Sequence, residues 1–380
     1  MDKEKQTKIL KDLIHINSVN GNELDVADYL ARLFAQYGMD AKVDAFGERR
    51  ANLIVEFGPG NTDQVLGITG HMDTVAVGNR ANWHHDPFGA EIQGDRLFGR
   101  GAADMKSGLA AQVIALIELK ESGWQPDGKI RLIATAGEEY GTPGANRLEE
   151  KGVAKDLSAL IVGEPTGGNI VYATSGSYNY QVICKGRSAH SSMPERGINA
   201  VSGLARFIEL EASLFDNVPL DQYLGSVKHS ITILKAGDQV NTIPDRAELR
   251  GNLRPTRAFD NERVTQRLGQ AIDYLNQTTD YELTLNILND WWPIATDPQS
   301  DLVKLALKAA NDSYANQPEL TIINGATDAS VFVKHRADLP VVVLGADEWS
   351  RAHQVDEYTT WSSYFATINA YRTIMHDFFG

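Results

Sequence analysis

The sequence predicts an α/β protein whose mainly parallel sheet is interrupted by a smaller inserted domain. In the first part of the chain and again near its end, short apolar runs alternate with helical segments, which is typical of a parallel sheet covered by helices. In the middle, the segments follow the order βαββαβ. That order is the ferredoxin-like arrangement, which forms a complete small domain. A chain of 380 residues also agrees with two domains.

The larger domain draws its elements from both ends of the chain. Amphipathic patterns predict helices at 3–16 and 22–37, and Gly38 is a typical residue just past a helix end. A strong helical pattern covers 106–120. Apolar runs predict strands at 52–57, 65–69, 131–136, 159–162 and 340–344, and the last helices are predicted at 299–315 and 357–378.

The inserted domain is expected at 177–290, so the larger domain comprises 1–176 and 291–380. Its predicted strands are 178–185, 229–235, 246–254 and 281–288, and its predicted helices are 199–214 and 261–277.

Composition excludes several classes of protein. The chain has 36 Lys and Arg against 50 Asp and Glu, and the net charge of −14 argues against nucleic acid or an anionic membrane as partner. The single cysteine, Cys184, excludes intramolecular disulfides and Cys-rich zinc sites and favours a reducing compartment. The N-terminus has no apolar signal-like segment, and no stretch is apolar enough to span a bilayer. We therefore expect a cytoplasmic protein.

Metal-type ligands follow several predicted strands directly. The carboxyl ends of parallel strands share one edge of a sheet, where ligands collect. That edge is expected to gather His71, Asp73, Glu138, Glu139 and Glu164, with Asp104 at the start of the next helix and His353 beyond the strand at 340–344. Each residue alone has an ordinary structural explanation: Asp104 could cap its helix, and an adjacent Glu pair is usually a solvated face. Their shared position after β-rich runs favours a metal centre.

This set suits two divalent cations. Three carboxylates (Asp104, Glu139 and Glu164) and a bridging hydroxide would balance a charge of +4, and His71 and His353 would add neutral nitrogens. Mixed ligands of this kind suit Zn²⁺, and also Co²⁺ or Mn²⁺. Of the two adjacent glutamates, one could bind metal while the other acts as general base. Asp73 could accept the second ring N–H of His71.

The sequence resembles the two-zinc aminoacylase/carboxypeptidase metallohydrolase family, and within it the acetylornithine deacetylase/succinyl-diaminopimelate desuccinylase branch. The resemblance rests on seven motifs, in order along nearly the whole chain. These are GHMDTV at 70–75, WHHDPF at 83–88, GRGAADMKSG at 99–108, AGEEYG at 136–141, GEPT at 163–166, GRSAHSSMP at 186–194 and GATDAS at 325–330.

The resemblance implies a role for each candidate residue. One zinc would be bound by His71, Asp104 and Glu164, and the other by Asp104, Glu139 and His353, with Asp104 bridging. Glu138 matches the general base, and Asp73 matches the residue beside the first histidine ligand. A cis peptide bond is implied at Asp104–Met105.

The resemblance also implies that the inserted domain is a lid and a homodimerisation surface. His190 matches a histidine that stabilises the oxyanion, often from the partner subunit. Asn241 and Arg254 match substrate-binding residues of the lid, and Gly325 and Thr327 match a pocket loop. Without the resemblance, each residue has a structural explanation: His190 could be a capping residue, Asn241 a turn residue and Arg254 a surface charge.

The predicted function is metal-dependent hydrolysis of an N-acyl amino or diamino acid through a metal-bridging hydroxide. The alternative is a dipeptidase or carboxypeptidase of the same family, because Ser175 stands where relatives usually have a basic residue. A dianionic substrate needs cations, and Arg254 would have to supply one. A non-catalytic binding protein is disfavoured, because all five ligands and the base are present.

Overall fold

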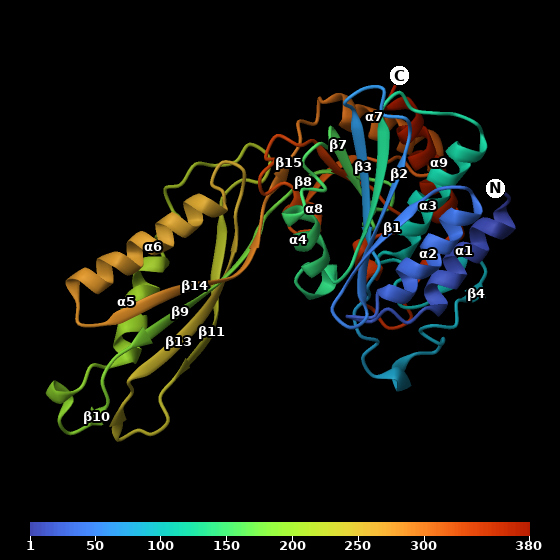
Figure 1. The fold of residues 1–380 in the computed structure, drawn as a ribbon. Coiled ribbons are helices and arrows are strands. Elements are labelled where there is room, and N and C mark those ends of the chain that lie inside the picture. Colours follow the sequence, from blue (N-terminus) through green and yellow to red (C-terminus); the bar gives the residue numbers. More distant parts are fainter. The chain divides into compact units, whose positions relative to one another are not determined.

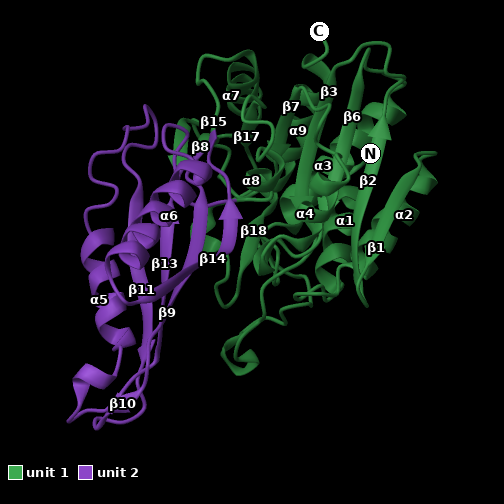
Figure 2. Ribbon diagram, turned by 60° about the vertical axis from the view of Figure 1, so that its left-hand side comes forward, with its two compact units in different colours: residues 1–173, 295–322, 327–380 green, residues 174–294, 323–326 purple.

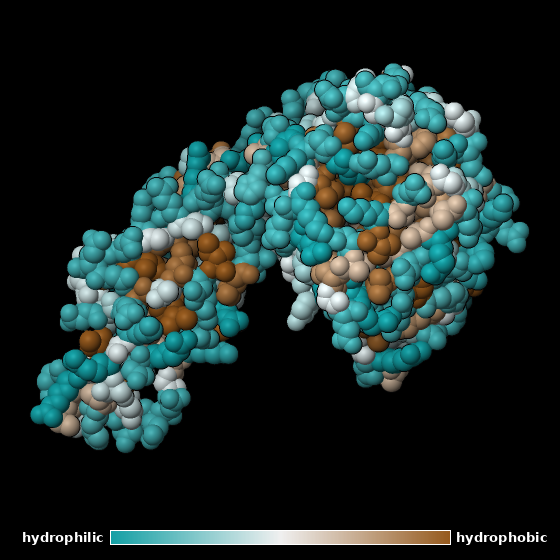
Figure 3. Space-filling view, in the orientation of Figure 1, coloured by the Kyte–Doolittle hydropathy of each residue, from teal (hydrophilic) through white to brown (hydrophobic).

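The computed structural model describes residues 1–380, which form two compact units (Figure 2). The first unit contains residues 1–173, 295–322 and 327–380, and the second contains residues 174–294 and 323–326. None of the helices combines the length and the hydropathy that a membrane span requires. Hydrophilic side chains cover most of the face shown in Figure 3, and apolar groups form separate patches on it.

A nine-stranded sheet forms the centre of the first unit. Its path is β1-β2-β6-β3-β7-β17-β8-β15, and β16 pairs with β8. The central strands are parallel, as predicted: β3 pairs with β6 and β7, and β17 pairs with β7. Antiparallel pairs lie on either side. The bounds are Ala41–Phe46 (β1), Arg50–Phe57 (β2), Val65–His71 (β3), Lys129–Thr135 (β6), Ala159–Val162 (β7), Ile170–Thr174 (β8), Ile294–Ala295 (β15), Leu320–Ile323 (β16) and Val341–Val343 (β17).

Helices cover this sheet (Figure 1). The helix α3 packs against α1 and α9, and it is buried on nearly every side, which explains why it is apolar all round. Gly108 in its first turn is required, because a Cβ there would lie 1.9 Å from the carbonyl oxygen of Gly163. The helices are α1 (Lys3–His15), α2 (Leu24–Gln36), α3 (Lys106–Glu121), α4 (Pro143–Glu150), α7 (Asp301–Ser313), α8 (Ala329–Phe332) and α9 (Trp361–Asp377).

The second unit has the predicted βαββαβ order. Its antiparallel sheet has the strand order β11-β13-β9-β14, and α5 and α6 pack on one face over a separate apolar core. The elements are β9 (Ser177–Lys185), α5 (Ala200–Glu211), β11 (Lys228–Ala236), β13 (Arg246–Arg254), α6 (Asn261–Thr278) and β14 (Glu282–Trp291), with a short pair of strands β10 (Ala189–His190) and β12 (Thr242–Ile243).

Several short elements were not predicted. A three-stranded sheet joins β4 (Glu91–Gln93), β5 (Arg96–Phe98) and β18 (Tyr358–Thr360). The predicted helix at 357–378 begins only at Trp361, because residues 358–360 pair with β5 instead. β1, β8 and α4 were also missed, and 3₁₀ turns lie at Arg80–Asn82 (η1), Glu138–Tyr140 (η2), Pro194–Arg196 (η3) and Trp349–Arg351 (η4).

Candidate metal centre

The strand ends bring the predicted ligands together. His71 ends β3, which lies between the parallel strands β6 and β7. His71 is in register with Thr135 of β6, so Glu138 and Glu139 follow close by in η2. Glu164 comes two residues after β7. Neighbouring parallel strands thus deliver an imidazole and three carboxylates to one edge of the sheet, as predicted.

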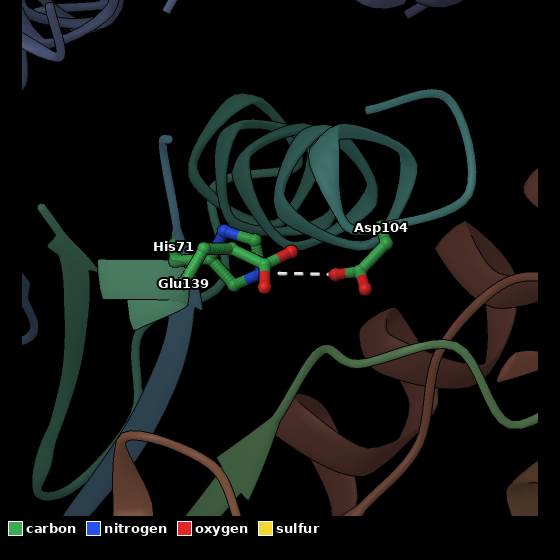
Figure 4. A group of neighbouring side chains, drawn as sticks. All are labelled: His71, Asp104 and Glu139. Atoms are coloured by element: carbon green, nitrogen blue, oxygen red, sulfur yellow. Dashed lines mark hydrogen bonds and ion pairs between the residues drawn. The ribbon is translucent and has the colours of Figure 1, made fainter. Parts of the chain in front are cut away.

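Asp104 faces two histidines, one with each carboxylate oxygen. Its Oδ1 lies 2.9 Å from His71 Nε2, and its Oδ2 lies 3.3 Å from His353 Nε2. The same nitrogen of His353 is 2.6 Å from Glu139 Oε1, and His71 Nε2 is 3.6 Å from Glu164 Oε1. Figure 4 shows His71 and Glu139 opposite Asp104. The peptide bond Asp104–Met105 is cis, which confirms that expectation.

This donor set fits divalent cations. Ligating atoms lie within 4.8 Å of one another in two groups: His71, Asp104 and Glu139, and His71, Glu138 and Glu164. Glu164 is 2% exposed, and its Oε2 is buried without a hydrogen-bond partner. Since a buried carboxylate oxygen without a partner is costly, this atom fits a metal ligand. The nitrogen and carboxylate donors are those that zinc accepts.

The shifted pKa values of these closely spaced acidic groups also agree with a metal site. Burial raises the pKa of Glu138 and of Glu164 well above the usual range, and neighbouring carboxylates add to that effect. For Asp104, burial is outweighed by hydrogen bonds from His353 and His71, which hold its pKa below the usual range. Hydrogen bonds to Asp104 and Glu139 raise the pKa of His353 to about 10. Bound cations would relieve this repulsion between buried carboxylates.

Asp73 holds the turn that presents the two glutamates. Its Oδ1 accepts hydrogen bonds from the backbone N–H groups of Gly137 (2.8 Å) and Glu138 (3.0 Å), and its Oδ2 accepts one from Glu139 (3.2 Å). Gly137 has φ 77°, which favours glycine. The expectation that the Asp73 carboxylate accepts the second ring N–H of His71 needs correcting. The backbone carbonyl of Asp73 is nearer to His71 Nδ1, at 3.0 Å, than its carboxylate, at 3.6 Å.

Glu357 is a buried residue of the centre that the sequence analysis missed. Its Oε1 accepts hydrogen bonds from the backbone N–H groups of Ala103 (2.9 Å) and Asp104 (3.1 Å), and its Oε2 pairs with Arg100. It stands four residues after His353, so it joins the loop of one predicted ligand to the loop of another. The available signal in the sequence was an acidic residue four positions after a predicted ligand.

Two other buried groups near the centre were also missed. Lys106 donates from Nζ to the carbonyl oxygens of Leu13 and Ile16 at the end of α1, which fixes the start of α3. Asp328 accepts a hydrogen bond from Thr135 with Oδ2, while its Oδ1 is buried without a partner. Burial raises the pKa of Asp328 to about 7.

We expect Glu357→Gln to weaken metal binding about 10- to 100-fold, because partners that orient metal ligands have effects of this size. The amide cannot accept both backbone N–H groups and also pair with Arg100. Metal content after dialysis against graded chelator measures the effect. The matched control is Glu319→Gln, which changes an exposed glutamate. Equal metal retention in both variants would contradict this role for Glu357.

The predicted substrate residues are divided between the units. Thr327 belongs to the first unit, is 1% exposed and accepts a hydrogen bond from Ala329 N–H at 3.3 Å. Four belong to the second unit: His190, Asn241, Arg254 and Gly325. His190 is exposed in β10, where its Nδ1 lies 2.8 Å from Ser192 Oγ, and Asn241 is exposed just before β12. Their roles stay predictions.

Comparisons with known proteins agree with this architecture. Residues 67–377 match the sequence model of the family described as Peptidase family M20/M25/M40. A "Probable succinyl-diaminopimelate desuccinylase" of Staphylococcus aureus (strain MSSA476) is 35% identical over 399 aligned residues, covering 98% of this chain and 96% of the relative.

Among solved structures, aminopeptidase PepT of Bacillus cereus ATCC 10987 has a TM-score of 0.78 at 22% identity, with 99% of each chain covered. The Bacillus subtilis YXEP protein, described as a dinuclear metal binding peptidase, has a TM-score of 0.70 at 15% identity, again with 99% of each chain covered. At these identities the two structures establish the shared fold.

Proposed function

Because the chain belongs to peptidase family M20/M25/M40 and is a hydrolase of amide or peptide bonds, we propose that it removes an N-acyl group from an amino or diamino acid. One observation carries this choice: the desuccinylase relative is 35% identical over 98% of the chain, whereas the peptidase structures are similar mainly in fold. The preferred substrate is an N-succinyl diamino acid, and an N-acetyl amino acid comes next.

The metal centre would be held by residues of the first unit. His71, Asp104 and Glu164 would bind one cation, and Asp104, Glu139 and His353 the other, most simply as Zn²⁺, with Co²⁺ as a substitute. When bound, such cations polarise a substrate carbonyl and lower the pKa of water. Support comes from Asp104, which directs one oxygen to each histidine.

Glu138 would move the protons of the reaction. It would take a proton from the attacking water and later give it to the leaving nitrogen. Glu138 is 9% exposed, and the hydrogen bond from its backbone N–H to Asp73 fixes the backbone that carries the carboxylate. Asp73 is a positioning residue in this scheme, because it contacts the turn and His71.

The second unit would bind the substrate. We propose that residues 177–290 form the lid and the homodimer surface, while 1–176 and 291–380 form the di-metal domain. His190 would donate to the oxyanion of the tetrahedral intermediate. Asn241, Arg254, Gly325 and Thr327 would contact the substrate. The exposure of His190 and Asn241 supports these roles, because both side chains are open to a ligand.

The alternative is a dipeptidase or carboxypeptidase that uses the same centre on a peptide bond. The alternative is favoured by the fold shared with the aminopeptidase PepT and by Ser175, which stands where relatives usually have a basic residue. The two functions differ in the substrate and not in the residues that would move protons.

A substrate panel separates the two functions. We expect the zinc- or cobalt-loaded protein to hydrolyse N-succinyl-diaminopimelate or N-acetylornithine, and chelator to abolish the reaction, because the centre needs its cations. Product release is measured by chromatography for both acyl substrates and for several dipeptides. Cleavage of dipeptides alone would move the assignment to a peptidase. No cleavage of any substrate by protein with its metals bound would overturn the enzymatic proposal.

A further inference from the structure

Two cations lie directly opposite each other in the sheet of the second unit. Lys228 begins β11 and Arg254 ends β13, and the two are paired in the antiparallel register. Their neighbours in the strands face the helices: His229 Nδ1 lies 2.7 Å from Glu211 of α5, and Leu253 is in the core. Because side chains alternate along a strand, Lys228 and Arg254 project side by side from the helix-free face.

This pair has no acidic partner. Like charges directly opposite each other destabilise a sheet, yet neither residue has a carboxylate within ion-pair distance. Lys228 Nζ makes one contact, at 3.5 Å to Asn324 Oδ1. Arg254 is half-buried, its guanidinium has no hydrogen bond or ion pair, and burial lowers its pKa. Because no protein group occupies the guanidinium of Arg254, it is available to pair with an anionic ligand.

Two other cations of the same sheet have acidic partners. Lys185 lies 3.3 Å from Glu282, and Arg246 lies 3.7 Å from Glu248. Lys235, near the other end of β11, is in register with Glu248. Arg250, in the middle of β13, has no ion pair either, but it is exposed and its register partner on β11 is Ile233, so Lys228 and Arg254 are the two cations that lie directly opposite each other.

Asn324 connects the pair to the loop that leads back into the first unit. Its Oδ1 accepts a hydrogen bond from Ser175 Oγ at 3.3 Å as well as the contact from Lys228. It lies in the segment 323–326, directly before Gly325 and three residues before Thr327. The same face also presents polar amides, since Asn252 Nδ2 donates to Asn179 Oδ1 at 2.6 Å.

We propose that Lys228 and Arg254 together bind one carboxylate of the substrate, so that Lys228 is a specificity residue for acyl amino acids with a second negative charge. The inference rests on the proposed N-acyl hydrolase function. Arg254 offers a planar fork that pairs with both carboxylate oxygens, and Lys228 adds a second positive charge beside it. Lys228 thereby supplies a second cation beside Arg254 for a dianionic substrate.

The test compares Lys228→Met with Lys235→Met. Both variants remove an exposed lysine from β11, but only the first removes the charge opposite Arg254. We expect Lys228→Met to raise KM for N-succinyl-diaminopimelate about 10- to 100-fold with little change in kcat, as for loss of a charge-assisted hydrogen bond. Lys235→Met should match the wild type, and Lys228→Arg should restore most of the affinity. Calorimetry with succinate as probe gives a readout that is independent of turnover.

Each outcome is decisive for the pair. A KM effect on N-succinyl-diaminopimelate but not on N-acetylornithine would support the inference, because only the first substrate has more than one carboxylate. An equal effect on both would place the bound group on the α-carboxylate that they share and would overturn the specificity role of Lys228. A Lys228→Met/Arg254→Met double variant should lose less than the sum of the single losses, because both groups bind one carboxylate. Unchanged KM and succinate affinity in Lys228→Met, or equal losses in Lys235→Met, would overturn the inference. Absence of wild-type hydrolysis would instead count against the proposed function.

Discussion

Replacing Glu138 by Gln should lower kcat about 10²- to 10⁴-fold, the usual contribution of a positioned general base. The amide has nearly the same shape but cannot accept the proton of the attacking water. The backbone of residue 138 should keep its place, because Asp73 binds its N–H and not its side chain. Steady-state kinetics and metal analysis of the same preparation measure the effect.

Glu150→Gln is the matched control, since Glu150 is exposed at the end of α4. Metal content should be equal in both variants and in the wild type, because Glu138 is not among the proposed ligands. A Glu138→Gln protein with normal kcat would refute the base assignment. Loss of metal in that variant would make Glu138 a ligand instead.

Replacing Asp104 by Asn should remove both metal ions and abolish activity. Asp104 directs one oxygen to His71 and the other to His353, so each of its oxygens reaches a different predicted site. The amide keeps the volume of the side chain but loses the charge and one of the two acceptor oxygens. The loss of metal affinity should exceed the roughly 10- to 100-fold loss expected for Glu357→Gln.

Glu164→Gln is the comparison variant for Asp104→Asn. Glu164 approaches His71 and not His353, so this change should release one metal ion and leave the other. Elemental analysis of both variants gives the stoichiometry, and thermal unfolding in chelator shows whether the metal-free chains are equally folded. Two ions retained by a folded Asp104→Asn protein would contradict a bridging Asp104.

The edge of the sheet that carries the candidate metal ligands could be predicted from the sequence, because it depends on which residues directly follow each apolar run. His71, Glu138 and Glu164 each follow an apolar run, and parallel strands place such positions at one edge whatever the details of packing. The βαββαβ unit could be predicted for a similar reason, since its six segments are long and contiguous.

The features that were missed depend on contacts between distant residues. Glu357 acts on the backbone of Ala103 and Asp104, more than 250 positions away in the chain. Strand β18 forms because residues 358–360 pair with β5, which overrides the start of the predicted helix. The pairing of Lys228 with Arg254 depends on strand register, which the residues alone do not reveal.

The two-metal centre is tested by anomalous diffraction at the zinc edge from crystals of the zinc-loaded protein. We expect two peaks, one coordinated by His71, Asp104 and Glu164, and the other by Asp104, Glu139 and His353. A single peak, or zinc bound away from Asp104, would contradict the two-metal centre from which the proposed function follows.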